Sequence, residues 1–173
     1  RTSWATVTAT GVLFEGNNNV YGISSGGAIS LTNCLLKNCK QAVVITSTNV
    51  TAKVTAVGTT FYNNGNISTL ASGGAISGGV TATRCAFIGN KAKTSGGAIY
   101  SPDGGVIVKD SVFTGNTVSN GDGGAIYSGG ITLSRCAFYN NQASNNGAAV
   151  YKPSTSVYAR SEERRVGKEG RSR

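Results

Sequence analysis

Histidine is absent from the 173-residue sequence, methionine is absent as well, and only 13% of the residues are charged. Without histidine, the chain has no Ser-His-Asp or Cys-His catalytic set and no histidine-based metal site. The acidic residues before position 160 are Glu15, Asp103, Asp110 and Asp122, which are far apart in the chain. Sugar-cleaving enzymes need paired carboxylates, or aspartate clusters that hold Ca²⁺. We therefore predict no enzyme activity in this chain, no catalytic residue, no cofactor and no metal site.

Long apolar runs are also missing, so the sequence predicts no membrane-spanning helix, which needs about 20 such residues. The formal net charge is +9, but the basic residues are scattered singly rather than clustered with aromatic residues. That distribution argues against a nucleic-acid partner. The chain begins with Arg1 and shows no signal peptide, so we expect a fragment truncated at both ends.

The last fourteen positions, 160–173, differ sharply in composition from the rest of the chain. They read RSEERRVGKEGRSR and contain no asparagine and no aromatic residue. This segment closely resembles the translation of a short-read sequencing adapter. We therefore predict a single repeat domain over residues 1–159, followed by a disordered tail that is an adapter artefact.

Two short motifs recur through residues 1–159 with the same period. One is Phe-x-x-Asn, with a degenerate copy at Leu36 and Cys39, and its first positions are separated by 22 to 26 residues. The other is Gly-Gly-Ala-Ile, which starts at Gly26, Gly73, Gly96 and Gly123 and has a weakened copy at Gly147. Short apolar runs bounded by Gly, Asn and Ser, repeated at this period, are typical of a parallel β-helix. The fold class predicted is all-β, a right-handed parallel β-helix of the pectin-lyase-like type with about six coils.

Aligning the coils on their phenylalanines predicts which side chains point inward. The phenylalanine column is Phe14, Phe61, Phe87, Phe113 and Phe138. The motif asparagines are predicted to form an internal hydrogen-bonded ladder, since each amide can donate to one coil and accept from another. The ladder residues are Asn17, Asn64, Asn90, Asn116 and Asn141. The position two before each motif start should also point inward, which includes Val12 and makes Cys34, Cys85 and Cys136 small buried thiols rather than disulfide partners. The apolar column changes parity upstream of it, so we predict a bend there. The inward pairs beyond the bend are Val7/Ala9, Ile29/Leu31, Val54/Ala56, Val80/Ala82, Val106/Val108 and Ile131/Leu133.

The pairing of Gly-Gly-Ala-Ile with Phe-x-x-Asn resembles the repeat of the chlamydial polymorphic outer-membrane proteins. That resemblance covers nearly all of residues 1–159 and implies an autotransporter-type passenger, displayed on the cell surface for adhesion. The chain departs from the family pattern because it contains no C-terminal membrane barrel and because Leu36 and Cys39 replace the usual motif residues in one coil.

Two outward-facing features are candidates for surface binding. Thr8, Thr10, Thr81 and Thr83 belong to paired threonine columns that resemble the face of β-helical ice-binding proteins, although Val57, Ile107 and Lys109 interrupt them and threonine is also an ordinary exposed strand residue. Tyr100, Tyr127 and Tyr151 follow the Gly-Gly-Ala-Ile-type motifs and are candidates for stacking on sugar rings or for simple cross-strand packing.

A third outward column contains charged residues. Asp110 lies in register with Arg84 and Arg135 on adjacent coils. The alternation of sign predicts a surface ion-pair ladder rather than a catalytic group.

The functional interpretation is a non-catalytic, extracellular or cell-surface β-helix passenger for adhesion or structural display, in the outer membrane if the source is bacterial. One alternative is a fragment of a carbohydrate-active β-helix whose active site lies outside this chain, and a minor one is ice binding. The expected partners are a host-surface protein or glycan. Unpaired strand edges at the end coils also predict end-to-end self-association.

Overall fold

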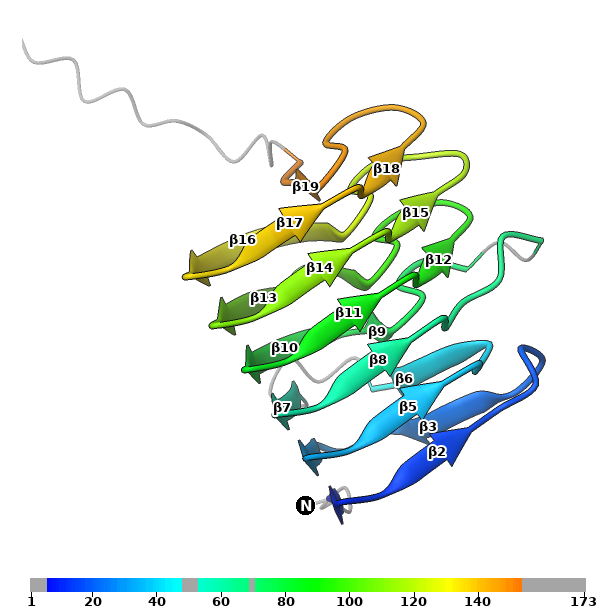
Figure 1. The fold of residues 1–173 in the computed structure, drawn as a ribbon, viewed down its shortest axis with the longest axis vertical. Coiled ribbons are helices and arrows are strands. Elements are labelled where there is room, and N and C mark those ends of the chain that lie inside the picture. The colour runs from blue at the N-terminus through cyan, green and yellow to red at the C-terminus, as the bar shows by residue number, and fades with distance from the viewer. Residues whose placement is uncertain (1–5, 48–52, 69–70, 154–173) are drawn as a thin grey trace, which may run out of the picture.

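The computed structural model describes residues 6–47, 53–68 and 71–153. The predicted disordered tail lies outside these ranges. Every regular element in them is a β-strand, and every strand pairing is parallel. Figure 1 shows the strands stacked as successive coils of one solenoid, with the N-terminal coil at one end and β19 near the other. The predicted β-helix of about six coils is therefore confirmed.

Each coil presents three faces to the outside. The first face is formed by four strands and by the second halves of two long ones. These strands are β1 (Val7–Thr10), β4 (Ile29–Thr32), β7 (Lys53–Val57), β10 (Gly79–Thr83), β13 (Ile99–Lys109) and β16 (Ile126–Ser134). The pairing register places residues 106–109 of β13 beside residues 80–83 of β10 and 131–134 of β16.

The second face is a six-stranded sheet of short strands that carry the phenylalanines. Its members are β2 (Leu13–Glu15), β5 (Leu35–Lys37), β8 (Thr60–Tyr62), β11 (Ala86–Ile88), β14 (Val112–Thr114) and β17 (Ala137–Tyr139). In Figure 1 these strands climb the front of the solenoid from β2 to β17.

The third face returns the chain to the start of the next coil. It comprises β3 (Tyr21–Ser25), β6 (Gln41–Ile45), β9 (Ile76–Ser77), the first halves of β13 and β16, and β19 (Val150–Tyr151). A small sheet of β12 (Lys91–Ala92), β15 (Thr117–Val118) and β18 (Gln142–Ala143) lies between the second and third faces. In Figure 1 the chain crosses the front from left to right and returns behind while it climbs, so the solenoid is right-handed.

The strand register matches the columns predicted from the repeat. Phe87 pairs with Phe61 on one side and with Phe113 on the other. On the first face, Val80 pairs with Val54 and Val106. Like residues stack on like because each coil contacts only its neighbours and must bury the same face.

A bend separates the first and second faces at the same point of each coil. The residue three before each phenylalanine, or before Leu36, has a positive φ, between 50° and 64°. These corner residues are Gly11, Asn33, Gly58, Arg84, Asp110 and Arg135. Glycine and asparagine tolerate this left-handed conformation, whereas arginine adopts it only under constraint. One left-handed residue explains why the inward-facing positions change parity between the two strands.

The Gly-Gly turn before the third face uses its two glycines for different reasons. Gly96 has a φ of +60°, which favours a residue without a Cβ. Gly97 has no such φ, but a Cβ there would collide with the backbone of Gly124 and Thr117 in the next coil. The motif therefore combines one conformational requirement with one close approach between coils.

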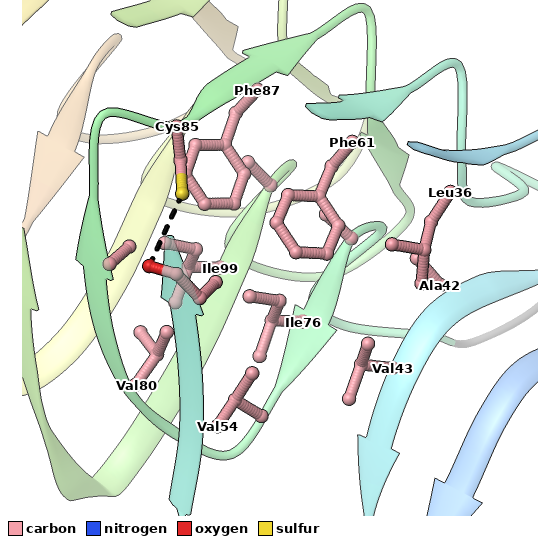
Figure 2. Packing of buried hydrophobic residues seen from close by; sticks show 14 of the residues in the cluster. Leu36, Ala42, Val43, Val54, Phe61, Ile76, Val80, Cys85, Phe87 and Ile99 are labelled. Atoms are coloured by element: carbon pink, nitrogen blue, oxygen red, sulfur yellow. Dashed lines mark hydrogen bonds between the residues drawn. The ribbon is translucent and has the colours of Figure 1, made fainter. Parts of the chain in front are cut away.

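The interior is filled by the aligned apolar columns. Figure 2 shows the rings of Phe61 and Phe87 side by side, with Leu36 continuing their row and Val54, Ile76, Val80 and Ile99 lining the opposite walls. Phe61, Phe87 and Phe113 are fully buried, and their adjacent rings are stacked with interplanar angles of 2° to 6°. Burial of this kind is the dominant favourable contribution to folding.

The end coils depart from the predicted burial. Val12 is 38% exposed and Leu133 is 37% exposed, although both were expected to point inward. Phe14 and Phe138 are half-buried and pack against the core. Each of these positions lies in the first or last described coil, where the described residues supply a neighbouring coil on one side only.

Candidate functional site

The asparagine ladder lies inside the solenoid, where the phenylalanine strands end. Asn64, Asn90 and Asn116 are fully buried. The Nδ2 of Asn90 donates to the Oδ1 of Asn116 at 3.0 Å and to the backbone oxygen of Phe61 at 3.0 Å, and its Oδ1 accepts from the Nδ2 of Asn64 at 3.0 Å. The ladder continues to Asn141. These bonds satisfy buried polar atoms, so the ladder is structural.

The prediction that Asn17 joins the ladder is wrong. Asn17 is exposed, and its Oδ1 accepts a hydrogen bond from the backbone nitrogen of Asn19 at 3.1 Å. The position above it in the next coil is Cys39, whose backbone nitrogen donates to the Oδ1 of Asn64. A cysteine cannot both donate and accept as an amide does, so the row of amides stops at Asn64.

The tyrosine column lies on the outside of the third face. Tyr100, Tyr127 and Tyr151 occupy equivalent positions of β13, β16 and β19. Adjacent ring centroids are 5.3 and 5.5 Å apart and the rings are tilted by 37° and 43°, unlike the flat stack of phenylalanines inside. Burial raises the pKa of Tyr127, with smaller contributions from its two tyrosine neighbours and Asp122. The column is a half-buried aromatic strip, and the raised pKa of Tyr127 keeps its hydroxyl group protonated at neutral pH.

The threonine columns are placed on the first face in the predicted register. Thr8 pairs with Ser30, and Thr81 pairs with Thr55 and Ile107. Thr8 and Thr10 are exposed, whereas Thr81 and Thr83 are half-buried. Because Ile107 and Lys109 continue these columns on β13, the face presents a mixed surface rather than an uninterrupted threonine array.

A pocket of 340 Å³ opens beside the tyrosine column and was not predicted from the sequence. It is lined by Tyr21, Lys40, Gln41, Ala71, Ser72, Ser77 and Tyr100. The pocket forms at the level of β9, which has only two residues, whereas β3 and β6 have five each.

Three residues of the pocket lining are held in place by specific contacts. Gln41 is 7% exposed, and its Nε2 donates to the backbone oxygens of Ser72 and Gly73. The Nζ of Lys40 lies 4.9 Å from the ring centroid of Tyr21, within cation–π distance. Tyr21 and Lys40 belong to none of the recurring columns, so the repeat pattern gave no signal that they would meet.

The acidic side chains serve surface contacts. Asp110 accepts from the Nη2 of Arg135 at 2.8 Å and pairs with its Nε, while Arg84 contributes only longer-range attraction. The Arg135 hydrogen bond lowers the pKa of Asp110, so this pair's contribution to stability is present above the ordinary carboxyl pKa and is lost on acidification through the lowered one. Glu15 pairs with Lys37 at 3.1 Å. Within the described ranges, no three His, Cys, Asp or Glu residues are grouped to hold a metal ion.

The four cysteines are free thiols. Cys34, Cys39 and Cys85 are buried, whereas Cys136 is half-buried near the end of the solenoid. The Sγ of Cys85 donates to the backbone oxygen of Ala56 at 3.4 Å, the dashed contact in Figure 2. Burial raises the pKa of Cys39 and of Cys85, which keeps both protonated and unreactive at neutral pH.

We expect Ellman's reagent to modify Cys136 first in the native protein, because the other three thiols are covered by neighbouring coils. All four thiols should react after denaturation in guanidinium chloride. A Cys136→Ala variant provides the control, since it should remove the fast phase alone. Rapid reaction of the remaining thiols in the folded Cys136→Ala variant would contradict the burial of Cys34, Cys39 and Cys85.

Comparison with known proteins identifies the repeat. A family model described as the Chlamydia polymorphic membrane protein repeat matches residues 84–102, 110–129 and 135–152. No curated protein and no solved structure matches the chain. Each matched segment begins at a left-handed corner residue, passes through the phenylalanine strand and ends beside the tyrosine column. The chain is therefore a parallel β-solenoid in which three segments match the Chlamydia polymorphic membrane protein repeat.

Proposed function

We propose that the chain is a non-catalytic β-solenoid passenger displayed on a cell surface, where its outer faces serve adhesion. The observation that carries the proposal is the polymorphic membrane protein repeat, whose family name supports a surface or outer-membrane location. No described segment forms a helix of the length and apolarity that a membrane span requires. The solenoid is accordingly proposed as the displayed part of an autotransporter-like protein.

Side chains fill the interior of the solenoid, which supports a binding role for its outer surface. Phenylalanine and asparagine columns fill the centre of the described coils, so ligands can reach only the three outer faces. Among the acidic residues, Glu15 and Asp110 form ion pairs, and Asp122 accepts hydrogen bonds from Asn146. These contacts favour a structural role for the carboxylates over a catalytic one.

Adhesion can be tested with polystyrene beads coated with the full 173-residue chain and applied to cultured epithelial cells. We expect the coated beads to be retained several-fold more than beads coated with albumin, or with the same chain after heat unfolding. Retention equal to both controls would refute an adhesive role. Display is tested separately, because antibodies against the chain should label intact source cells without permeabilisation.

The absence of catalysis is tested on polysaccharides. We expect no release of reducing ends and no formation of unsaturated uronates when the chain is incubated with pectin, alginate, heparin or chitin. Steady product formation, abolished by substitution of Asp103 or Asp122, would overturn the non-catalytic proposal. It would favour a carbohydrate-active β-helix instead.

A further inference from the structure

Building on the adhesive role proposed above, we propose that the pocket lined by Tyr21, Lys40, Gln41, Ser77 and Tyr100 binds an acidic saccharide. The ligand class is a sugar that carries a carboxylate or a sulfate group. The pocket is contributed by four successive coils, since Tyr21 lies in β3, Gln41 in β6, Ser77 in β9 and Tyr100 in β13. The site exists only when those coils are stacked in register.

The size and walls of the pocket suit a sugar ring. Its volume of 340 Å³ lies at the lower end of the roughly 300–1,000 Å³ that is typical of small-ligand sites. Tyr21 and Tyr100 offer aromatic surface with a hydroxyl group at one end, which matches a ring that has apolar C–H faces and a polar rim. Gln41 and Ser77 add polar groups to the lining. A small number of polar groups beside aromatic surfaces fixes the orientation of a bound ligand.

The charge in the pocket indicates an acidic ligand. Lys40 is the charged residue of the lining, and none of Glu15, Asp103, Asp110 and Asp122 lines the pocket. The ion pairs found among the described residues join Lys37 to Glu15 and Arg135 to Asp110, so neither uses Lys40. Its contact with the Tyr21 ring holds the ammonium group at the pocket wall. A carboxylate or sulfate would supply the anion that this position lacks.

The tyrosine column extends the same site along the solenoid. Tyr100 belongs both to the pocket and to the column that continues through Tyr127 to Tyr151. Adjacent rings are tilted by 37° and 43° rather than stacked flat, and all three side chains are half-buried rather than fully covered. A saccharide with its acidic group at Lys40 can therefore place further sugar rings along this strip.

Binding is measured by isothermal titration calorimetry of the full chain with three hexasaccharides, from heparin, hyaluronan and chitin. Heparin carries sulfate and carboxylate, hyaluronan carries carboxylate alone, and the chitin oligomer is neutral. We expect at least one acidic hexasaccharide to bind at least about tenfold more tightly than the neutral one. The two acidic ligands distinguish sulfate from carboxylate recognition. Raising the salt from about 0.1 M to about 1 M should weaken acidic binding, because screening shortens the range of the Lys40 charge.

Matched variants locate the binding to the pocket. Lys40→Gln and Tyr100→Ala should each weaken acidic binding at least about tenfold. The controls are Lys53→Gln, an exposed lysine of the first face, and Tyr139→Ala, an exposed tyrosine of the second face. Both controls should bind within about twofold of the unmodified chain. Circular dichroism melts of all four variants should coincide with that of the parent, which excludes unfolding as the cause of lost affinity.

Several outcomes would overturn the assignment. These are the absence of acidic binding, equal binding of the neutral hexasaccharide, and equal losses in Lys40→Gln and Lys53→Gln. The bead assay separates this proposal from the adhesive role. If coated beads adhere normally with Lys40→Gln and no hexasaccharide binds, the pocket assignment fails while adhesion stands. If acidic hexasaccharides bind but coated beads do not adhere, the pocket assignment stands and adhesion fails.

Discussion

Replacement of Phe113 by alanine should lower the free energy of unfolding by about 3–5 kcal/mol, as truncation of a buried phenylalanine does. The ring is fully buried, and its centroid lies 4.5 Å from that of Phe87 and 4.8 Å from that of Phe138. Removal leaves a cavity between two rings that cannot close without moving whole coils. Because coils couple to their neighbours, the coils beyond Phe113 should lose stability as well.

Urea denaturation, followed by far-ultraviolet circular dichroism, measures this effect. Two variants serve as controls. Phe138→Ala removes the same ring from a half-buried position in the last phenylalanine strand, and Tyr139→Ala removes a ring that is 58% exposed. The unfolding midpoint should fall most for Phe113→Ala and least for Tyr139→Ala. Equal midpoints for all three variants would show that Phe113 does not occupy the centre of the core.

The second large effect is expected from Asn90→Ala, which interrupts the internal ladder. Asn90 accepts hydrogen bonds at its Oδ1 from the backbone nitrogen and the Nδ2 of Asn64, and it donates to the oxygens of Phe61 and Asn116. Alanine removes these four bonds and leaves the backbone N–H of Asn64 and one of its Nδ2 hydrogens without a partner, whereas the Oδ1 of Asn116 still accepts from the backbone nitrogen at position 90. Each buried group left unpaired destabilises by about 1–3 kcal/mol, so the free energy of unfolding should fall by at least about 2 kcal/mol.

Asn17→Ala is the matched control, since Asn17 stands at the same motif position but is exposed and contacts only Asn19 in the described hydrogen bonds. Its free energy of unfolding should change by less than about 0.5 kcal/mol, as surface substitutions do. Thermal melts of both variants would measure the difference. Similar losses in the two variants would mean that the motif asparagine acts through the local turn rather than through the ladder.

The architecture could be predicted from the sequence because the same motif positions recur in successive coils, so that aligning one column aligns the others. Once Phe61, Phe87 and Phe113 are aligned, the register of the first face follows, and Val54, Val80 and Val106 stack as expected. A period-two strand pattern alone would not have given that alignment, since the strands of the second face are only three residues long. The two recurring motifs gave the signal. The Gly26 copy of Gly-Gly-Ala-Ile is nevertheless out of phase, because Ile29 pairs with Val54 on the first face whereas Ile76 pairs with Val43 on the third.

The errors in that prediction have physical causes that a repeat cannot show. The motif predicted Asn17 as a ladder residue, but ladder membership depends on the amide of the next coil, and Cys39 stands there. The motif also predicted Val12 and Leu133 as buried, but burial depends on a covering coil. The parity change was expected, yet its mechanism was not. A positive φ at Arg84, Asp110 and Arg135 is not foreseeable from residue type.

The pocket was missed for a different reason. Sequence reasoning selected columns in which the same residue type recurs, such as Tyr100, Tyr127 and Tyr151. The pocket is formed where the recurrence fails. Tyr21, Lys40 and Gln41 lie in the coils in which Ser24 and Val44 stand in the tyrosine column, and the neighbouring strand β9 has only two residues. In this repeat protein the positions that recur in every coil predict the scaffold. The candidate binding site is formed by positions that do not recur.

Distances between spin labels on the first face test the stacking of the coils most directly. Thr8, Thr81 and Thr132 share one outward column, in which three strand steps separate Thr8 from Thr81 and five separate Thr8 from Thr132. At about 4.8 Å a step, the backbone separations are about 14 Å and about 24 Å. Labels at Thr8→Cys with Thr81→Cys, and at Thr8→Cys with Thr132→Cys, are introduced in a Cys136→Ala background. Pulsed electron resonance should give two narrow distributions that differ by about 10 Å. Broad distributions, or two that coincide, would contradict the parallel solenoid.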